Sequence, residues 1–159
     1  MVRSWIIVAI ATGMSANAAA CSPFQVEPFL IEPVGASGEI IPSHAPVVRV
    51  VEVHRGRRAS EGEDLCVETA FVSLCIEDAS PSAPFVYSFK QVGGEAPDSI
   101  FPGGLFLGQG SDNGERQFSF FWLERSEDPK PFAIEVQVTP YSRSGTPGPS
   151  TTLVVRSEI

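Results

Sequence analysis

Three cysteines, Cys21, Cys66 and Cys75, are the side chains of this 159-residue chain best suited to covalent chemistry. An odd number leaves one thiol over when the others pair. If Cys21 is used elsewhere, Cys66 and Cys75 remain as a disulfide candidate. A disulfide needs Cα atoms within about 7 Å, whereas a straight strand would hold these two about 30 Å apart. We therefore expect the bond only if Cys66 lies in a loop that folds back or the strand is broken; buried free thiols are the alternative.

The two histidines, His44 and His54, could in principle bind a metal ion or act as general bases. No H-x-x-x-H, C-x-x-C or acidic EF-hand pattern accompanies them, and no G-x-S-x-G turn marks a catalytic serine. The glycine-rich residues 108–114 lack the spacing of a phosphate-binding loop and precede a strand instead of a helix. We predict no catalytic residue, no metal site and no cofactor.

The first twenty residues, MVRSWIIVAIATGMSANAAA, have the composition of an export signal. Arg3 supplies a positive charge, residues 5–11 an apolar stretch, and residues 16–20 the small side chains of a cleavage region. A membrane span needs about 20 apolar residues, which this run does not reach. We predict that residues 1–20 are a cleaved signal peptide and that the protein is exported.

The residues that end this segment, Ala18-Ala19-Ala20-Cys21, resemble the lipobox of bacterial lipoproteins. The resemblance implies that Cys21 is lipidated and that, with Ser22 after it, the protein is sorted to the outer membrane. Lipoboxes usually carry leucine where this chain has Ala18. Cleavage by a general signal peptidase, which leaves a soluble periplasmic or secreted protein, is the alternative.

One polar loop holds three arginines that could contact a partner: Arg55, Arg57 and Arg58. Guanidinium groups suit the recognition of carboxylates, so these residues could bind an acidic partner. The acidic residues within 61–64 of the same loop could instead neutralise them.

Phe121 lies in an aromatic run, FSFFWL, over residues 118–123. Such a run is typical of a central strand that is covered on both faces. Alternatively, one face is a surface aromatic patch for a protein or sugar partner. Phe121 is therefore a second candidate for a partner surface.

The net charge limits the partners. The chain has a formal net charge of −8, and Arg3 is the only charged residue of the first twenty. A mature chain would thus be more acidic still. Nucleic-acid binding needs a basic surface, so we exclude it. Adsorption to anionic lipid is disfavoured for the same reason, and a membrane contact would need the lipid anchor.

The apolar pattern is that of strands. Five prolines in residues 21–46 forbid a helix and indicate a Pro-rich tether and lead-in. Turn signals such as Asp112-Asn113-Gly114 separate the strand candidates within residues 47–159. There are seven candidates: residues 47–53, 66–76, 85–90, 105–107, 117–123, 131–139 and 151–155. We predict an all-β domain built as an antiparallel two-sheet sandwich.

Two stretches resemble bacterial Ig-like and fibronectin type III domains. EPVGASGEIIPSHAPVVRV is similar to the segment that leads into their first strand, and FAIEVQVTPYSRSGTPGPSTTLVV to their last two strands. The resemblance implies an Ig-like sandwich with an adhesion, scaffold or binding role. The Cys…Trp…Cys arrangement of antibody-type domains is absent, because Trp122 follows both cysteines of the domain.

We expect a non-catalytic binding or structural module of the bacterial cell envelope, whose partner is an envelope protein or a glycan. Fold alone does not fix function. The alternative is a small envelope enzyme on a β-sandwich, such as one that acts on carbohydrate. It would need paired carboxylates in one cleft. Four acidic residues flank the strands: Glu68, Glu77, Asp78 and Glu124.

Overall fold

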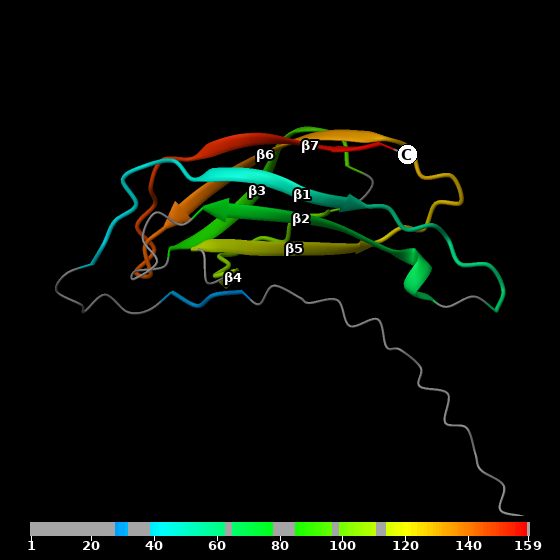
Figure 1. Cartoon of the computed structure of the whole chain (residues 1–159), viewed down its shortest axis with the longest axis horizontal. Coiled ribbons are helices and arrows are strands. Elements are labelled where there is room, and N and C mark those ends of the chain that lie inside the picture. Colours follow the sequence, from blue (N-terminus) through cyan, green and yellow to red (C-terminus); the bar gives the residue numbers. More distant parts are fainter. Residues whose placement is uncertain are drawn as a thin grey trace, which may run out of the picture.

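The computed structural model describes residues 28–31, 39–62, 65–77, 85–96, 99–110 and 114–158. Seven strands form two antiparallel sheets that pack face to face (Figure 1). The four-stranded sheet has the order β1-β2-β5-β4 and the three-stranded sheet the order β3-β6-β7. The strands are β1 (Val47–His54), β2 (Thr69–Glu77), β3 (Val86–Gly94), β4 (Gln109–Gly110), β5 (Glu115–Leu123), β6 (Phe132–Tyr141) and β7 (Thr151–Ser157). The predicted all-β, two-sheet fold is confirmed.

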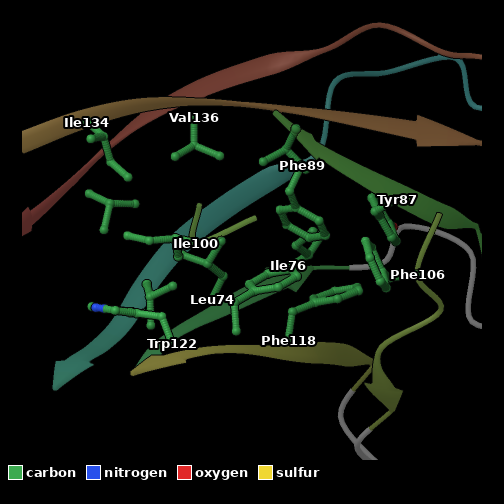
Figure 2. Close-up of a cluster of buried hydrophobic side chains, with 14 of the residues drawn as sticks. Leu74, Ile76, Tyr87, Phe89, Ile100, Phe106, Phe118, Trp122, Ile134 and Val136 are labelled. Carbon is green, nitrogen blue, oxygen red and sulfur yellow. The ribbon is translucent and has the colours of Figure 1, made fainter. Parts of the chain in front are cut away.

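The core lies between the two sheets and follows from alternation along the strands, because successive side chains point to opposite faces. In β6, Phe132, Ile134, Val136 and Val138 are buried while Ala133 and Glu135 are exposed. This is the alternation that the sequence predicts. From the other sheet, strands β2 and β5 contribute Val72 and Phe120. They also contribute four residues that Figure 2 labels: Leu74, Ile76, Phe118 and Trp122.

Both sides of the sandwich are closed by contacts between the sheets. On one side, Phe106 and Tyr87 exchange two backbone hydrogen bonds, with N···O distances of 2.8 and 2.9 Å. This pair joins the segment before β4 to the edge strand β3. On the other side, β1 lies beside β7 (Figure 1). The two sheets are thus tied together at both pairs of edges.

The edge strand β1 carries a β-bulge at Val51, where the register against β2 shifts between Val50 and Glu52. An extra residue in one strand bends it and increases its twist. Residues on both faces of β1 remain accessible, and Val47, Val50 and Val51 are exposed.

Three of the predicted strands differ from the structure by more than two residues at an end. Residues from Cys66 to Glu68 do not extend the second strand but form η1 (Leu65–Glu68), a single 3-10 turn. Strand β3 continues through Gly94, four residues beyond its predicted end. The apolar run 105–107 makes only a bridge at Phe106, and the strand that pairs with β5 is the two-residue β4.

Strands β4 and β5, on either side of the predicted Asp112-Asn113-Gly114 turn, pair antiparallel with Gln109 opposite Gln117. Its residues 111–113 lie outside the described residues. In the part of the chain that the structure describes, no helix is long and apolar enough to cross a membrane.

Candidate functional site

Three aromatic rings form a row across the outer face of the four-stranded sheet, one ring from each of three neighbouring strands. His54 of β1 lies opposite Phe71 of β2, and Phe71 lies opposite Phe121 of β5. The ring centroids of His54 and Phe71 are 5.1 Å apart with an interplanar angle of 21°. Those of Phe71 and Phe121 are 5.6 Å apart with an angle of 45°. We call these three residues the aromatic row.

The aromatic row faces away from the core because its members alternate with core residues. In β5, Phe120 and Trp122 are buried between the sheets, so Phe121 points to the opposite face. Phe71 and Phe121 are half-buried and His54 is exposed. Leu123, the next residue of β5 on this face, is 50% exposed and extends the apolar surface beyond the row.

The ring geometry limits what this surface can bind. His54 is stacked on Phe71, so each of these rings covers one face of the other. The stack therefore leaves less flat ring area for a partner than two separate rings would. The partly exposed ring of Phe121 lies beside it.

Arg55 directly follows His54, the last residue of β1. Its side chain points inward and is not part of this surface. Its Nε donates a hydrogen bond of 3.0 Å to Glu124 Oε2, and its Nη2 forms an ion pair with the same oxygen. The two side chains are only 10% and 5% exposed. The guanidinium also lies 5.2 Å from the ring centroid of Phe132. Arg55 was a predicted partner contact, and its charge is instead engaged by a largely buried carboxylate of the same chain, which leaves little of its side chain accessible.

The loop that follows Arg55 is held by backbone hydrogen bonds to η1 and to the loop after β5. The Arg57 amide donates to the carbonyl of Val67 at 2.7 Å, and the Arg58 amide to that of Ser126 at 3.2 Å. Arg58 Nη1 forms an exposed ion pair of 3.3 Å with Glu127. This partner comes from the loop that follows β5. Arg57 and Arg58 are exposed, and their role as a partner surface stays a prediction.

Gly56 explains why this loop can pack so closely. A Cβ atom on Gly56 would lie 2.6 Å from the backbone carbonyl carbon of Glu68. Only a glycine leaves room for this approach of two backbones. The loop, η1 and the end of β5 therefore form one packed end of the sandwich, where the amide of Glu124 also donates to the carbonyl of Glu68 at 2.7 Å.

The predicted Cys66–Cys75 disulfide is wrong. Cys75 is a free, buried thiol in β2, while Cys66 in η1 is disulfide-bonded. Strand β2 is continuous from Thr69. Cys75 therefore lies six residues beyond Thr69, which is about 20 Å along the strand. The alternative of a buried free thiol is confirmed for Cys75.

Cys75 lies on the outer face of the sheet, opposite Arg49 of β1 and Gln117 of β5. Burial raises the pKa of its thiol, and the nearby Arg49 guanidinium opposes this shift. Arg49 also donates a hydrogen bond of 3.1 Å to Glu115. These side chains leave the small Cys75 covered on an otherwise accessible face.

A separate open pocket of about 720 Å³ lies at the other end of the four-stranded sheet. Its polar lining includes His44, Glu77 and Glu115. The two glutamates are register partners on the adjacent strands β2 and β5, so they stand on one wall of the pocket. A pair of glycosidase carboxylates must instead flank the scissile bond from both sides.

The remaining acidic candidates are engaged in the packed end. Glu124 bonds Arg55, and Glu68 Oε1 accepts a hydrogen bond of 3.0 Å from the Ala59 amide. Asp78 lies outside the described residues, as does the lipidation candidate Cys21. Among the described residues, no group of three or more His, Cys, Asp and Glu side chains could hold a metal ion.

The sequence pointed to Phe121 but missed two of its neighbours. From the sequence, His54 is a candidate only for a metal ligand or a general base. No sequence pattern distinguishes Phe71 from the rest of its apolar run. The register of β1, β2 and β5 brings the three rings together, and this register cannot be read from one strand alone. No family model, no curated protein and no solved structure matches the chain.

Proposed function

We propose that this protein is an exported, non-catalytic binding module that docks a partner protein on the aromatic row. The observation that carries the proposal is the register of His54, Phe71 and Phe121, which gathers three partly exposed rings on one sheet face. Leu123 extends this apolar surface, and the exposed Arg57 and Arg58 follow His54 in the next loop of the chain. Aromatic anchors with arginines around them are typical of protein interfaces.

The ring geometry favours a protein over a glycan. A sugar ring is bound best by an open aromatic face, and the stacking of His54 on Phe71 covers one face of each ring. A cluster of three mutually contacting rings fits against the apolar side chains of a protein partner. We therefore assign the docking surface to a partner protein of the cell envelope.

The positions of the acidic residues favour binding over catalysis. Glu124 and Glu68 have structural partners, and Glu77 and Glu115 share one wall of their pocket. The export signal of residues 1–20 supports an envelope location. The two-sheet antiparallel architecture is compatible with the Ig-like resemblance of the sequence, and we include an Ig-like domain in the proposal.

Photo-crosslinking tests the docking surface. Leu123 is replaced by the photoreactive residue benzoylphenylalanine in the full chain, expressed with its own signal in a Gram-negative host and irradiated in intact cells. We expect one discrete crosslinked protein that mass spectrometry identifies and that disappears when Phe121→Ser is added. Val154, which is 45% exposed on the three-stranded sheet, is the matched control position and should give no such product.

Two results would contradict the proposal. Equal crosslinking from positions 123 and 154 would mean that the aromatic row has no special role. Binding of purified chain to peptidoglycan or capsular glycan that Phe121→Ser abolishes would replace the protein partner with a carbohydrate.

A further inference from the structure

We infer that the partner of this protein adds an extended strand to the free half of β5, beside the aromatic row. Strand β4 is short and pairs only with Arg116 and Gln117, near the beginning of β5 (Figure 1). Strand β5 continues to Leu123. Among the described residues, no strand pairs with residues 118–123 on the side away from β2. The inference rests on the proposed function in one respect, since it takes the partner to be a protein.

The hydrogen bonds between β2 and β5 identify the backbone groups at this free edge. The Glu124 amide donates to the carbonyl of Glu68 at 2.7 Å, and these two residues continue the β2–β5 register by one pair. Hydrogen-bonded and non-hydrogen-bonded pairs alternate along an antiparallel ladder. Counting back from Glu124, the backbone of each even-numbered residue of β5 therefore faces β2. The amides and carbonyls of the odd-numbered residues face the free edge, and beyond β4 these are Ser119, Phe121 and Leu123.

The free half of β5 lacks the features that keep a strand edge unpaired, which are bulges, charged residues and prolines. It pairs with β2 without a register shift, and its sequence, FSFFWL, has no charged residue and no proline. The edge strands β1 and β3, by contrast, each carry a register shift, between Val50 and Glu52 and between Gln91 and Gly93. The free half of β5 is therefore a regular template onto which another strand can pair.

An open pocket of about 290 Å³ lies beside this edge and can receive a side chain of the added strand. Residues 119–121 of β5 form one wall, and the rest of the lining includes Ile100, Pro102 and Phe106. Ile100 and Phe106 belong to the core, so the pocket extends from the edge toward the core. Successive side chains of a strand point to opposite faces. An added strand can therefore place one side chain in this pocket and the next beside Phe121.

The same pocket favours a segment of another protein over a second copy of this chain. In a symmetric dimer, two copies would join through the free halves of their β5 strands. The inward side chains of β5, Phe118, Phe120 and Trp122, are buried in the core of their own copy and cannot enter the pocket. The net charge of −8 also opposes the association of two copies. The occupant is therefore an extended segment of a different protein, with apolar side chains for the pocket and for the aromatic row.

Amide hydrogen exchange of the purified full chain, followed by NMR, tests the free edge first. We expect fast exchange at residues 119, 121 and 123 and slow exchange at residues 118, 120 and 122, because only the second set is bonded to β2. Equal protection of the two sets would overturn the inference, since the edge would then already be covered.

The probe for strand addition is a panel of acetylated octapeptides that alternate threonine with valine, leucine or phenylalanine. At about ten times its Kd, a peptide that pairs with the edge should slow exchange at residues 119, 121 and 123 about tenfold. The same peptide with every amide methylated keeps its side chains but not its donors, and it should give no protection. The inference fails if no peptide of the panel protects these residues, or if the methylated peptide protects them equally.

Ser119→Pro tests the edge from the side of the protein. Proline removes an amide that faces away from β2, a position that an edge strand tolerates, and it should abolish the protection of residues 121 and 123. Ser73→Ala is the control, because it removes the 2.9 Å hydrogen bond between the Ser73 and Ser119 hydroxyls and leaves every edge amide in place. It should bind the peptides as the wild type does. Protection that persists in a folded Ser119→Pro would contradict the added strand.

Crosslinking from position 123 in cells separates this inference from the proposed function. A partner that is captured in the Ser119→Pro background but lost with Phe121→Ser would support the aromatic row and overturn the added strand. Peptide protection in vitro without a captured partner in cells would support the binding edge and contradict the proposed docking function.

Discussion

The ion pair between Arg55 and Glu124 connects the end of β1 to the end of β5 across the strand that lies between them. The two residues are 69 positions apart in the sequence, and β2 separates their strands in the sheet. Arg55 also donates to the carbonyl of Lys130 at 2.7 Å and to Ser157 Oγ at 3.2 Å. One side chain therefore holds three strands and a loop at the packed end of the sandwich.

Arg55→Met should destabilise the protein strongly, because it leaves the Glu124 carboxylate buried without its counter-charge. We expect the free energy of unfolding to fall by about 3–5 kcal/mol, measured by urea denaturation. The double variant with Glu124→Leu should recover much of the loss. Arg58→Met, which removes an exposed ion pair, is the control and should cost less than about 1 kcal/mol. Equal losses in the two arginine variants would mean that the Arg55 pair is not effectively buried.

Gly56→Ala should test the close approach of the loop to η1. The new Cβ would lie 2.6 Å from the backbone of Glu68, which side-chain rotation cannot relieve. We expect a loss of about 1–3 kcal/mol, measured as a lower midpoint of urea unfolding. Gly103→Ala is the matched control, because no atom lies within 4 Å of its Cβ position. A neutral Gly56→Ala would show that the loop can move away without cost.

Phe118 and Phe121 lie on opposite faces of β5 and should respond differently to truncation. Phe118 is fully buried and packs against Tyr87 and Phe89, so Phe118→Ala should cost about 3–5 kcal/mol. Phe121 is half-buried and packs on Phe71, so Phe121→Ala should cost about 1 kcal/mol. Thermal melts of both variants measure the difference. A collapse of the fold in Phe121→Ala would place that ring in the core and remove the docking surface.

The free thiol of Cys75 should make stability depend on pH in the alkaline range. Burial raises the pKa of this thiol in the folded chain, so the folded state holds the proton more tightly than the unfolded state. Its contribution is fully present below the unfolded pKa of about 8.5 and is lost as the pH rises through the folded pKa. Urea unfolding of wild type should therefore weaken more than that of Cys75→Ala above about pH 8.5. Parallel curves for the two proteins would contradict this linkage.

The strand pattern was predictable because alternation along a strand is a local property. The run from Phe132 to Val138 shows its buried face without any tertiary information, and the structure confirms it. The boundary at Cys66 was not predictable, because residues 66–76 are apolar throughout. What ends the strand at Thr69 is the backbone pairing of η1 with the 56–58 loop and with Glu124.

The candidate site was predictable only in part for a related reason. Arginines 57 and 58 lie on the surface as expected, since a polar loop is exposed wherever it lies. The role of Arg55 depends on Glu124, and that of Phe121 on Phe71 and His54. These partners come from other strands, so their identity follows from sheet register and not from local sequence.

Trp122 gives the protein an internal optical reporter. Its indole is buried beside Phe132, with ring centroids 6.2 Å apart, and Phe132 in turn contacts Arg55. Among the described side chains, its Nε1 is the buried polar atom without a hydrogen-bond partner. The other tryptophan, Trp5, is lost if residues 1–20 are cleaved. The emission wavelength of the processed chain then reports on one side chain, and a red shift would register the opening of this end of the sandwich before the far end responds.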